Sequence, residues 1–269
     1  MNRIDEAFAR LKETGTGGLM PFVCAGAPTP DALVKVLPAL SDAGASVIEI
    51  GIPFSDPIAD GPVIAAAMHD AIQRGTTPAQ VFEQVRSVRD RVDCGIVAMV
   101  SVSLVHAQGG PAGFAAKARD AGFDGCIFPD APLEESAELG AACKDAGLTC
   151  SLLIAPTTPE ARAKAIAEAC SGFVYMLARA GITGEQKDAP EIEARVQMLR
   201  RVTRLPIACG FGIATADHVR AVVQHADAAI VGTALVRRLD AAHKQGQPLG
   251  PEAEAFLTEL STGLVPMRL

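Results

Sequence analysis

Tryptophan is absent from the 269-residue chain, and tyrosine occurs once, as Tyr175. Apolar residues nevertheless make up 49% of the sequence, and charged residues only 20%. A chain of this length and composition can bury a large core built mainly from aliphatic side chains. The composition is not typical of a disordered protein.

Long apolar runs and basic clusters are also missing. No run approaches the roughly 18 residues of a membrane span, and the charged, amphipathic start of the chain lacks the apolar centre of a secretory signal. The formal net charge is −7, so neither nucleic acid nor an acidic membrane surface is an expected partner. These features predict a cytoplasmic protein.

The cysteines and histidines do not show the sequence spacing that is typical of metal ligands. The seven cysteines are odd in number, contain no Cys-x-x-Cys pair and mostly lie in apolar runs. We therefore expect buried free thiols in a reducing compartment rather than disulfides or zinc. The five histidines are equally scattered, and we predict no metal site.

Short apolar runs alternate with longer amphipathic segments along the chain. The predicted strands are 19–24, 47–50, 95–100, 125–128, 149–154, 172–176, 207–209 and 228–231. The predicted helices are 31–43, 78–92, 113–121, 134–146, 159–169, 192–202 and 215–224, with an extra one at 2–13 and a last one at 251–260. Gly44, Gly122 and Gly147 each follow an Asp-Ala pair, where a left-handed helix cap is expected.

Strands that alternate with helices and are apolar on both faces predict a parallel sheet covered on both sides. Eight strands in a chain of this length favour a single α/β domain over residues 1–269. The predicted fold is a (β/α)8 TIM barrel with an extra N-terminal helix, and with a C-terminal helix and tail from about residue 240. A doubly wound open sheet is the alternative, but no Gly-x-Gly-x-x-Gly pattern follows the first strand.

Glu49 interrupts an apolar strand, where an unpaired carboxylate is costly to bury. Asp56 and Asp60 lie in the loop that follows. Because barrel active sites lie at the C-terminal ends of the strands, these carboxyls are candidates for proton transfer. Glu49 could equally be a structural ion-pair partner, and the aspartates could be turn residues. The loops 51–62 and 178–191 are long enough to act as lids.

Glycines follow the last two predicted strands, in Gly210-Phe-Gly-Ile213 and in Val231-Gly-Thr-Ala-Leu235, where Gly232 and Thr233 begin a further predicted helix. Backbone N–H groups in such loops and the N-terminus of a following helix can converge on a phosphate. Either cluster alone is weak evidence, since tight turns also use glycine. Together, the two glycine clusters at these strand ends predict a phosphate site.

Other residues near strand ends have two interpretations. Tyr175, Phe22 and Phe211 can line a pocket or simply fill the top of the barrel. Asp130, in Phe128-Pro-Asp-Ala-Pro132, is better interpreted as part of a rigid loop than as a catalytic group.

The segment Glu49-Ile-Gly-Ile-Pro-Phe-Ser-Asp-Pro-Ile-Ala-Asp60-Gly-Pro closely resembles the hallmark of the tryptophan synthase alpha subunit family. Supporting matches extend over about residues 3–240 and include Phe128-Pro-Asp-Ala-Pro-Leu-Glu-Glu135, Gly181-Ile-Thr-Gly184 and both glycine loops. The resemblance implies a (β/α)8 barrel that cleaves indole-3-glycerol phosphate to indole and glyceraldehyde 3-phosphate in tryptophan biosynthesis. This reaction is a retro-aldol cleavage by a carbon–carbon lyase.

The resemblance also implies site roles. Glu49 would be the general acid/base that moves protons at indole C3 and at the glycerol hydroxyl. Asp60 would accept the indole N–H and stabilise positive charge on the ring, which fits a C–C bond that breaks only after C3 is protonated. The residues implied to contact substrate are Phe22, Tyr175, Thr183 and Phe211, and those implied to hold its phosphate are Gly184, Gly212, Gly232 and Thr233.

A partner follows from the same resemblance. The family works with a beta subunit in an alpha2beta2 assembly, and indole passes to it through a tunnel. Pyridoxal phosphate belongs to that beta subunit, so this chain is expected to hold no cofactor of its own.

Several positions depart from the family pattern. Ala27 replaces a usual aspartate, Ser101 a tyrosine, Ser103 an asparagine and Thr233 a serine. The segment Leu177-Ala-Arg-Ala180 also has alanines where serines or threonines are common. Ser101 leaves room beside the indole pocket, whereas Ala27 and Ser103 could weaken coupling to the beta subunit. Two alternatives therefore stay open, namely a mainly allosteric, non-catalytic alpha-like subunit and a stand-alone lyase that releases free indole.

Overall fold

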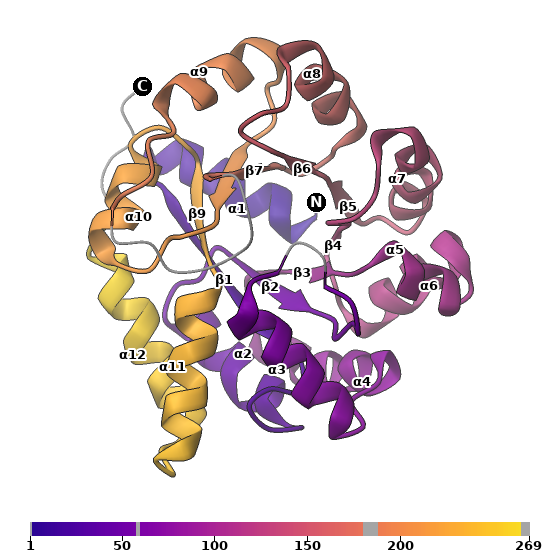
Figure 1. The fold of residues 1–269 in the computed structure, drawn as a ribbon, viewed down its shortest axis with the longest axis vertical. Helices are drawn as coiled ribbons and strands as arrows, with labels where there is room; N and C mark the ends of the chain where they lie inside the picture. Colours follow the sequence, from indigo (N-terminus) through magenta and orange to yellow (C-terminus); the bar gives the residue numbers. More distant parts are fainter. Residues whose placement is uncertain (1, 58–59, 180–187, 265–269) are drawn as a thin grey trace.

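The computed structural model describes residues 2–57, 60–179 and 188–264 of the chain. Nine parallel strand segments form one sheet in the order β5-β4-β3-β2-β1-β9-β8-β7-β6 (Figure 1). Their bounds are β1 (Gly18–Cys24), β2 (Val47–Gly51), β3 (Gly95–Met99), β4 (Gly125–Ile127), β5 (Thr149–Ser151), β6 (Leu153–Ile154), β7 (Val174–Leu177), β8 (Ile207–Gly210) and β9 (Ala228–Val231).

The predicted strand 149–154 is divided at Leu152 into β5 and β6. The β5 segment pairs with β4, and β6 pairs with β7. The β5 and β6 segments lie at the two ends of the strand order and belong to one stretch of chain. The nine segments therefore count as eight strands, and the sheet closes into a barrel. The prediction of a (β/α)8 TIM barrel is confirmed, and the open-sheet alternative is wrong.

Helices surround the barrel (Figure 1). They are α1 (Arg3–Thr14), α2 (Ala32–Asp42), α3 (Pro62–Gln73), α4 (Pro78–Val88), α5 (Val102–Ala107), α6 (Gly110–Ala121), α7 (Ser136–Asp145), α8 (Glu160–Ala169), α9 (Glu193–Val202), α10 (Ala216–Val223), α11 (Thr233–Lys244) and α12 (Leu249–Ser261), with 3-10 turns η1 (Arg89–Arg91) and η2 (Leu133–Glu135). The predicted left-handed caps are confirmed, with φ of 90° at Gly44, 97° at Gly122 and 74° at Gly147.

Two helices are missing from the sequence prediction. The α3 helix begins at Pro62, directly after the loop that follows β2. Proline is tolerated in the first turn of a helix but also marks loops, so the sequence does not show where the loop ends. The α5 helix has only six residues, too few to show a repeating apolar pattern. The α11 helix continues through residue 240, where a tail was expected, to Lys244.

Side chains alternate between two buried clusters along each strand. In β1, Met20 and Phe22 belong to the cluster inside the barrel, whereas Leu19 and Val23 belong to the cluster beneath the helices. The same alternation in β2 places Ile48 and Ile50 outside and Val47 inside. Glu49, two residues from Val47, therefore faces the barrel interior.

Helix α1 closes the N-terminal end of the barrel. Its Ile4 and Phe8 are buried within the inner cluster, and the Phe8 ring lies 5.7 Å from the ring of Phe173. Gly95 makes room for this helix, because a Cβ there would lie 2.8 Å from Ile4 Cγ1. The predicted extra N-terminal helix is thus confirmed as the floor of the barrel.

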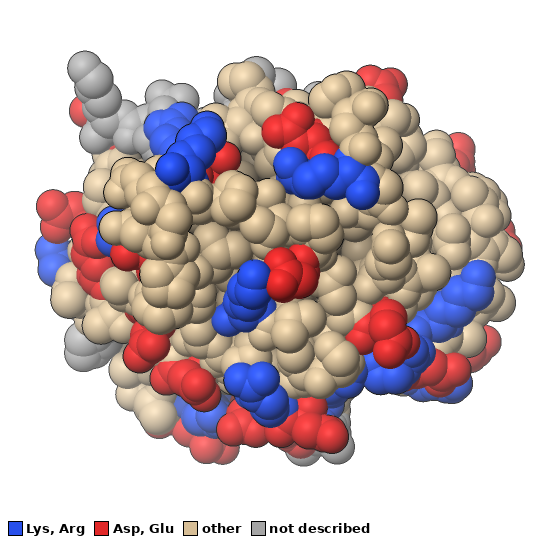
Figure 2. Space-filling view, turned by 90° about the horizontal axis from the view of Figure 1, so that it is seen from below, with Lys and Arg blue, Asp and Glu red and all other residues tan. Residues whose placement is uncertain are grey.

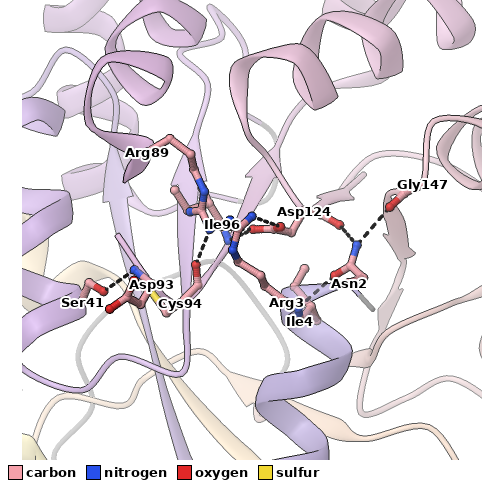
Figure 3. A network of polar contacts seen from close by, with 10 residues as sticks. All are labelled: Asn2, Arg3, Ile4, Ser41, Arg89, Asp93, Cys94, Ile96, Asp124 and Gly147. Atoms are coloured by element: carbon pink, nitrogen blue, oxygen red, sulfur yellow. Dashed lines mark hydrogen bonds and ion pairs between the residues drawn. The ribbon is translucent and has the colours of Figure 1, made fainter. Parts of the chain in front are cut away.

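A buried carboxylate, Asp124, connects this floor to the strands (Figure 3). It accepts a hydrogen bond from the Ile96 N–H at 2.8 Å, and it lies 3.3 Å from the Arg3 guanidinium and 3.5 Å from that of Arg89. Asn2 caps α1 through the Ile4 N–H and donates to the Asp124 carbonyl at 2.7 Å. The network therefore fixes α1 against β3 and β4.

Charges on the surface are mixed. On the face shown in Figure 2, acidic and basic side chains lie beside one another, with no large area of one sign. Among the described residues, no helix is long and apolar enough to cross a membrane.

Loss of the Asp124 carboxyl should destabilise the barrel. We expect Asp124→Ala to lower the free energy of unfolding by about 3 kcal/mol, because it leaves the buried Arg89 charge without its partner. Urea unfolding measures this loss. Asp120→Ala is the matched control, since its ion pair with Arg119 is exposed and should contribute less than about 1 kcal/mol. Equal losses in the two variants would contradict the structural role of Asp124.

Candidate active site

A pocket lies where the strands end, with walls from several strand ends and following loops. Eight of the residues predicted for the site line it, namely Phe22, Glu49, Asp60, Tyr175, Phe211, Gly212, Gly232 and Thr233. The other two, Thr183 and Gly184, lie outside the described residues. Residues of β1, β2 and β7 and of the segments that follow β2, β8 and β9 thus meet around one space, although they are far apart in the sequence.

Glu49 is buried in the wall of this pocket. It is the central residue of β2, level with Phe22 on β1 and Val97 on β3, and its side chain is only 1% exposed. Its Oε2 atom has no hydrogen-bond partner in the described structure, and no described lysine or arginine pairs with it. The structural ion-pair interpretation therefore has no support.

The environment of Glu49 favours its protonated form. Burial, with a smaller contribution from the charge of Asp60, raises the Glu49 pKa to about 8. A carboxyl with this pKa still holds its proton at neutral pH, yet it can release it without a large cost. These are the properties required of a general acid that later becomes a base.

Asp60 supplies the second carboxyl of the pocket. It lies at the end of the loop after β2, directly before the Gly61 cap of α3, and its N–H donates to the Pro57 carbonyl at 3.2 Å. Partial burial raises its pKa to about 6, so Asp60 is mainly ionised at neutral pH. The pocket thus combines a protonated carboxyl with a carboxylate.

Tyr175 faces the same space. Burial raises its pKa well above the usual value, and the charges of Glu49 and Asp60 add to this shift. The ring is 3% exposed and belongs to the inner cluster. It is therefore both a core residue and part of the pocket wall.

Two glycines at strand ends make room for the aromatic rings. A Cβ at Gly51 would lie 2.5 Å from Phe22 Cζ, and one at Gly210 would lie 2.5 Å from the Tyr175 hydroxyl oxygen. Any larger residue would push these rings out of position. Neither role is visible in the sequence, because only the strand register brings each glycine beside its ring.

The loops after β8 and β9 form the other end of the pocket. Phe211 and Gly212 adopt left-handed φ angles of 83° and 78°, a conformation that is unusual for a phenylalanine. The His218 ring on α10 supports this turn, with Nδ1 3.2 Å from the Gly212 carbonyl oxygen. Gly232 caps α11, and Thr233 is its first residue, so a helix N-terminus suited to anions faces the pocket.

Four apolar residues of the pocket were not predicted from the sequence, namely Ile64, Met99, Ile213 and Ile230. The inward positions of Met99 and Ile230 follow from strand alternation and could have been inferred from it. Ile64 lies on α3, which the sequence analysis missed.

Asp130 has the structural role expected of it. Its Oδ2 accepts from the Ser101 hydroxyl at 2.7 Å, and its Oδ1 accepts from the Val102 N–H at 3.0 Å. It therefore holds the N-terminus of α5.

The cysteines are free thiols, as expected, and five of the seven are buried. Among the described residues, no three His, Cys, Asp or Glu side chains are grouped to hold a metal ion.

Fold and site together define a (β/α)8-barrel protein with two carboxyls of different pKa in a pocket at the C-terminal end of its strands. The family model for the tryptophan synthase alpha chain matches residues 8–262. The tryptophan synthase alpha chain of Laribacter hongkongensis is 44% identical over 247 residues, which cover 91% of this chain and 93% of that relative. The alpha chain of Burkholderia thailandensis is 39% identical, covering 98% and 96%.

Solved structures agree with these relatives. Tryptophan synthase subunit alpha from Legionella pneumophila superposes with a TM-score of 0.89 at 32% identity, covering 98% of each chain. A chain of Mycobacterium tuberculosis tryptophan synthase gives 0.88 at 29% identity, covering 99% of each. The chain belongs to the tryptophan synthase alpha chain family, and the resemblance inferred from the sequence is confirmed.

The raised pKa of Glu49 should make stability depend on pH. Between about pH 4.5 and 8, the unfolded chain ionises Glu49 while the folded protein keeps it protonated, so folding stability falls as pH rises and levels off above pH 8. Glu49→Gln removes this pH-dependent loss of folding stability, because the amide does not ionise. Its free energy of unfolding relative to wild type should increase by about 1 kcal/mol or more from pH 5 to pH 8.5.

Urea unfolding at the two pH values measures the difference. Glu254→Gln, at an exposed position of α12, is the matched control and should show no such change. If Glu49→Gln changed the free energy of unfolding by the same amount at both pH values, a protonated, buried Glu49 would be contradicted.

Proposed function

We propose that this chain is the catalytic alpha subunit of tryptophan synthase, a lyase that cleaves indole-3-glycerol phosphate to indole and glyceraldehyde 3-phosphate. The observation that carries the proposal is the pair Glu49 and Asp60 in one pocket, where burial raises the Glu49 pKa to about 8 and the Asp60 pKa to about 6. Membership of the family supports the same conclusion.

Glu49 would move the protons. Its carboxyl donates a proton to C3 of the indole ring, which makes the ring a cation and weakens the bond from C3 to the glycerol carbon. That bond breaks as the hydroxyl on this carbon loses its proton to the Glu49 carboxylate. The bonding electrons return to the ring to give indole, and the former hydroxyl carbon becomes the aldehyde. No net proton is consumed, so one residue can serve both steps.

Asp60 would stabilise the cation. Protonation at C3 places positive charge on the ring, including its nitrogen, and a carboxylate that accepts the N–H lowers the energy of this state. Its partial burial strengthens the interaction, because fewer water molecules screen the two charges. The family resemblance assigns Thr183 to orient Asp60.

The glycine-rich end would hold the phosphate. Backbone N–H groups at Gly212, Gly232 and Thr233, together with the α11 N-terminus, suit a phosphate dianion, and Gly184 would complete the set. Phe22, Tyr175 and Phe211 would enclose the indole ring between this end and Asp60. Binding at both ends fixes C3 beside Glu49, which lowers the entropic part of the barrier.

A beta subunit would be the partner, as in other tryptophan synthases. Pyridoxal phosphate would belong to that subunit, because all the chemistry proposed for this chain is proton transfer by its own carboxyls. The buried free cysteines support a reducing compartment, the cytoplasm.

Indole release tests the proposal. Purified protein should form indole from indole-3-glycerol phosphate, and Glu49→Gln should reduce kcat by at least about a thousandfold, because the amide cannot donate the proton. Asp60→Asn should reduce it by about a hundredfold or more. Asp42→Asn, at the exposed last residue of α2, is the matched control and should stay within about threefold of wild type.

The assay is run with and without the organism's own beta subunit. Activation by the beta subunit is expected for a coupled alpha subunit. A wild-type protein without indole release in either condition would favour the non-catalytic alternative. Full activity alone, with no stable complex, would favour the stand-alone lyase. Substantial turnover by Glu49→Gln would overturn the assignment of the acid/base.

The rate should depend on pH in a defined way. Activity requires a protonated Glu49 and an ionised Asp60, so kcat/KM should fall below about pH 6 and again above about pH 8. The two limbs report on the coupled pair of carboxyls. The fall above pH 8 is the decisive one. The substrate phosphate itself titrates near pH 6, so it also affects the rate on the acid side. A rate that stays constant to pH 10 would contradict the role of Glu49.

A further inference from the structure

A second cavity, of about 260 Å³, adjoins the catalytic pocket. The two share Asp60, Met99 and Phe211 as a common wall. The second cavity far exceeds the roughly 10–15 Å³ that one water molecule requires. The glycine-rich end, at Gly212 and Gly232, lines only the first pocket. The second cavity therefore lies on the side of the site away from the proposed phosphate position.

The walls of the second cavity are mainly apolar. Beyond the shared residues they include Ile52, Phe54, Met68, Val100 and Leu153, while Asp56 and Asp130 add two carboxyls to the wall. Such a surface suits an apolar group much better than a charged one.

Ser101 keeps this cavity open. It lines the cavity and is 6% exposed. Its hydroxyl donates to Asp130 Oδ2 at 2.7 Å and accepts from the Ser103 N–H at 3.2 Å. These bonds fix the side chain at the start of α5, so a short residue is held where a larger one would fill the space.

We propose that the second cavity accepts a substituent on the benzene ring of the indole group, so that the protein cleaves ring-substituted indole-3-glycerol phosphates as well as the parent compound. This inference rests on the proposed function. With the phosphate at the glycine-rich end and the ring nitrogen at Asp60, the benzene ring extends to the shared wall. A small apolar substituent then passes into the cavity and buries its surface there. The bonds broken and formed are the same as for the parent.

Kinetics with methyl-substituted substrates test the inference. We would measure kcat/KM for indole-3-glycerol phosphate and for its 4-, 5-, 6- and 7-methyl analogues, because a methyl group adds volume with little change in charge. Wild type should cleave at least one analogue less than tenfold more slowly than the parent. Ser101→Tyr should reduce the ratio of that analogue to the parent at least tenfold, a loss expected when a methyl-sized group no longer fits.

Ser101→Ala is the matched control. It removes the same hydrogen bonds without filling the cavity, so its analogue-to-parent ratio should match that of wild type. Leu153→Phe fills the cavity from β6 and leaves the α5 cap intact, so it gives the same test if Ser101→Tyr does not fold. The ratio itself cancels general losses of stability or activity.

The outcomes separate this inference from the proposed function. Absence of parent cleavage by wild type would overturn the proposed function. Parent cleavage with every analogue reduced tenfold or more would overturn only the substituent cavity. So would an equal loss of parent and analogue in Ser101→Tyr and Leu153→Phe, because the cavity would then hold the unsubstituted ring.

Discussion

Closure of the barrel places every second residue of each strand in the buried interior of the barrel, and Glu49 is one of these residues. A carboxyl in this position cannot be solvated as an anion without a large cost in free energy, so it keeps its proton at neutral pH. Its neighbours in register on β1 and β3 are apolar. The proposed acid is therefore a consequence of the fold, since the same residue on the outer face of β2 would pack against helices and meet no substrate.

The two ends of the barrel differ in role: the floor contributes to stability, and the mouth carries the candidate active site. At the floor, Asp124 joins backbone and side-chain donors from α1, β3 and η1 in one network (Figure 3). Two buried Arg89 nitrogens, Nε and Nη1, have no hydrogen-bond partner there among the described residues. At the mouth, Glu49 has an unsatisfied buried oxygen, and Phe211 has a backbone conformation that its side chain disfavours. Polar groups that are costly in the free protein are typical of sites where a ligand later supplies the missing contacts.

Much of the fold and part of the site could be predicted from the sequence. The alternation of apolar strands with amphipathic helices is a local property, so the strands were found within about two residues, apart from the break at Leu152. Glu49 could be recognised because an unpaired carboxylate within an apolar strand is costly to bury. The α3 helix was missed because Pro62 fits both a loop and a first helical turn. Gly51 and Gly210 were missed because their importance depends on rings carried by other strands.

The sequence by itself determined the order of the strands and of most helices, the carboxyls available for chemistry and the family to which the chain belongs, because these depend on neighbouring residues and on motif spacing. Only the tertiary structure decided that Glu49 points inward, that Asp60 shares its pocket and acts on its pKa, and that Ser101 borders a second cavity. Each of these depends on strand register and burial, which bring together residues far apart in the chain and set the dielectric environment in which they act.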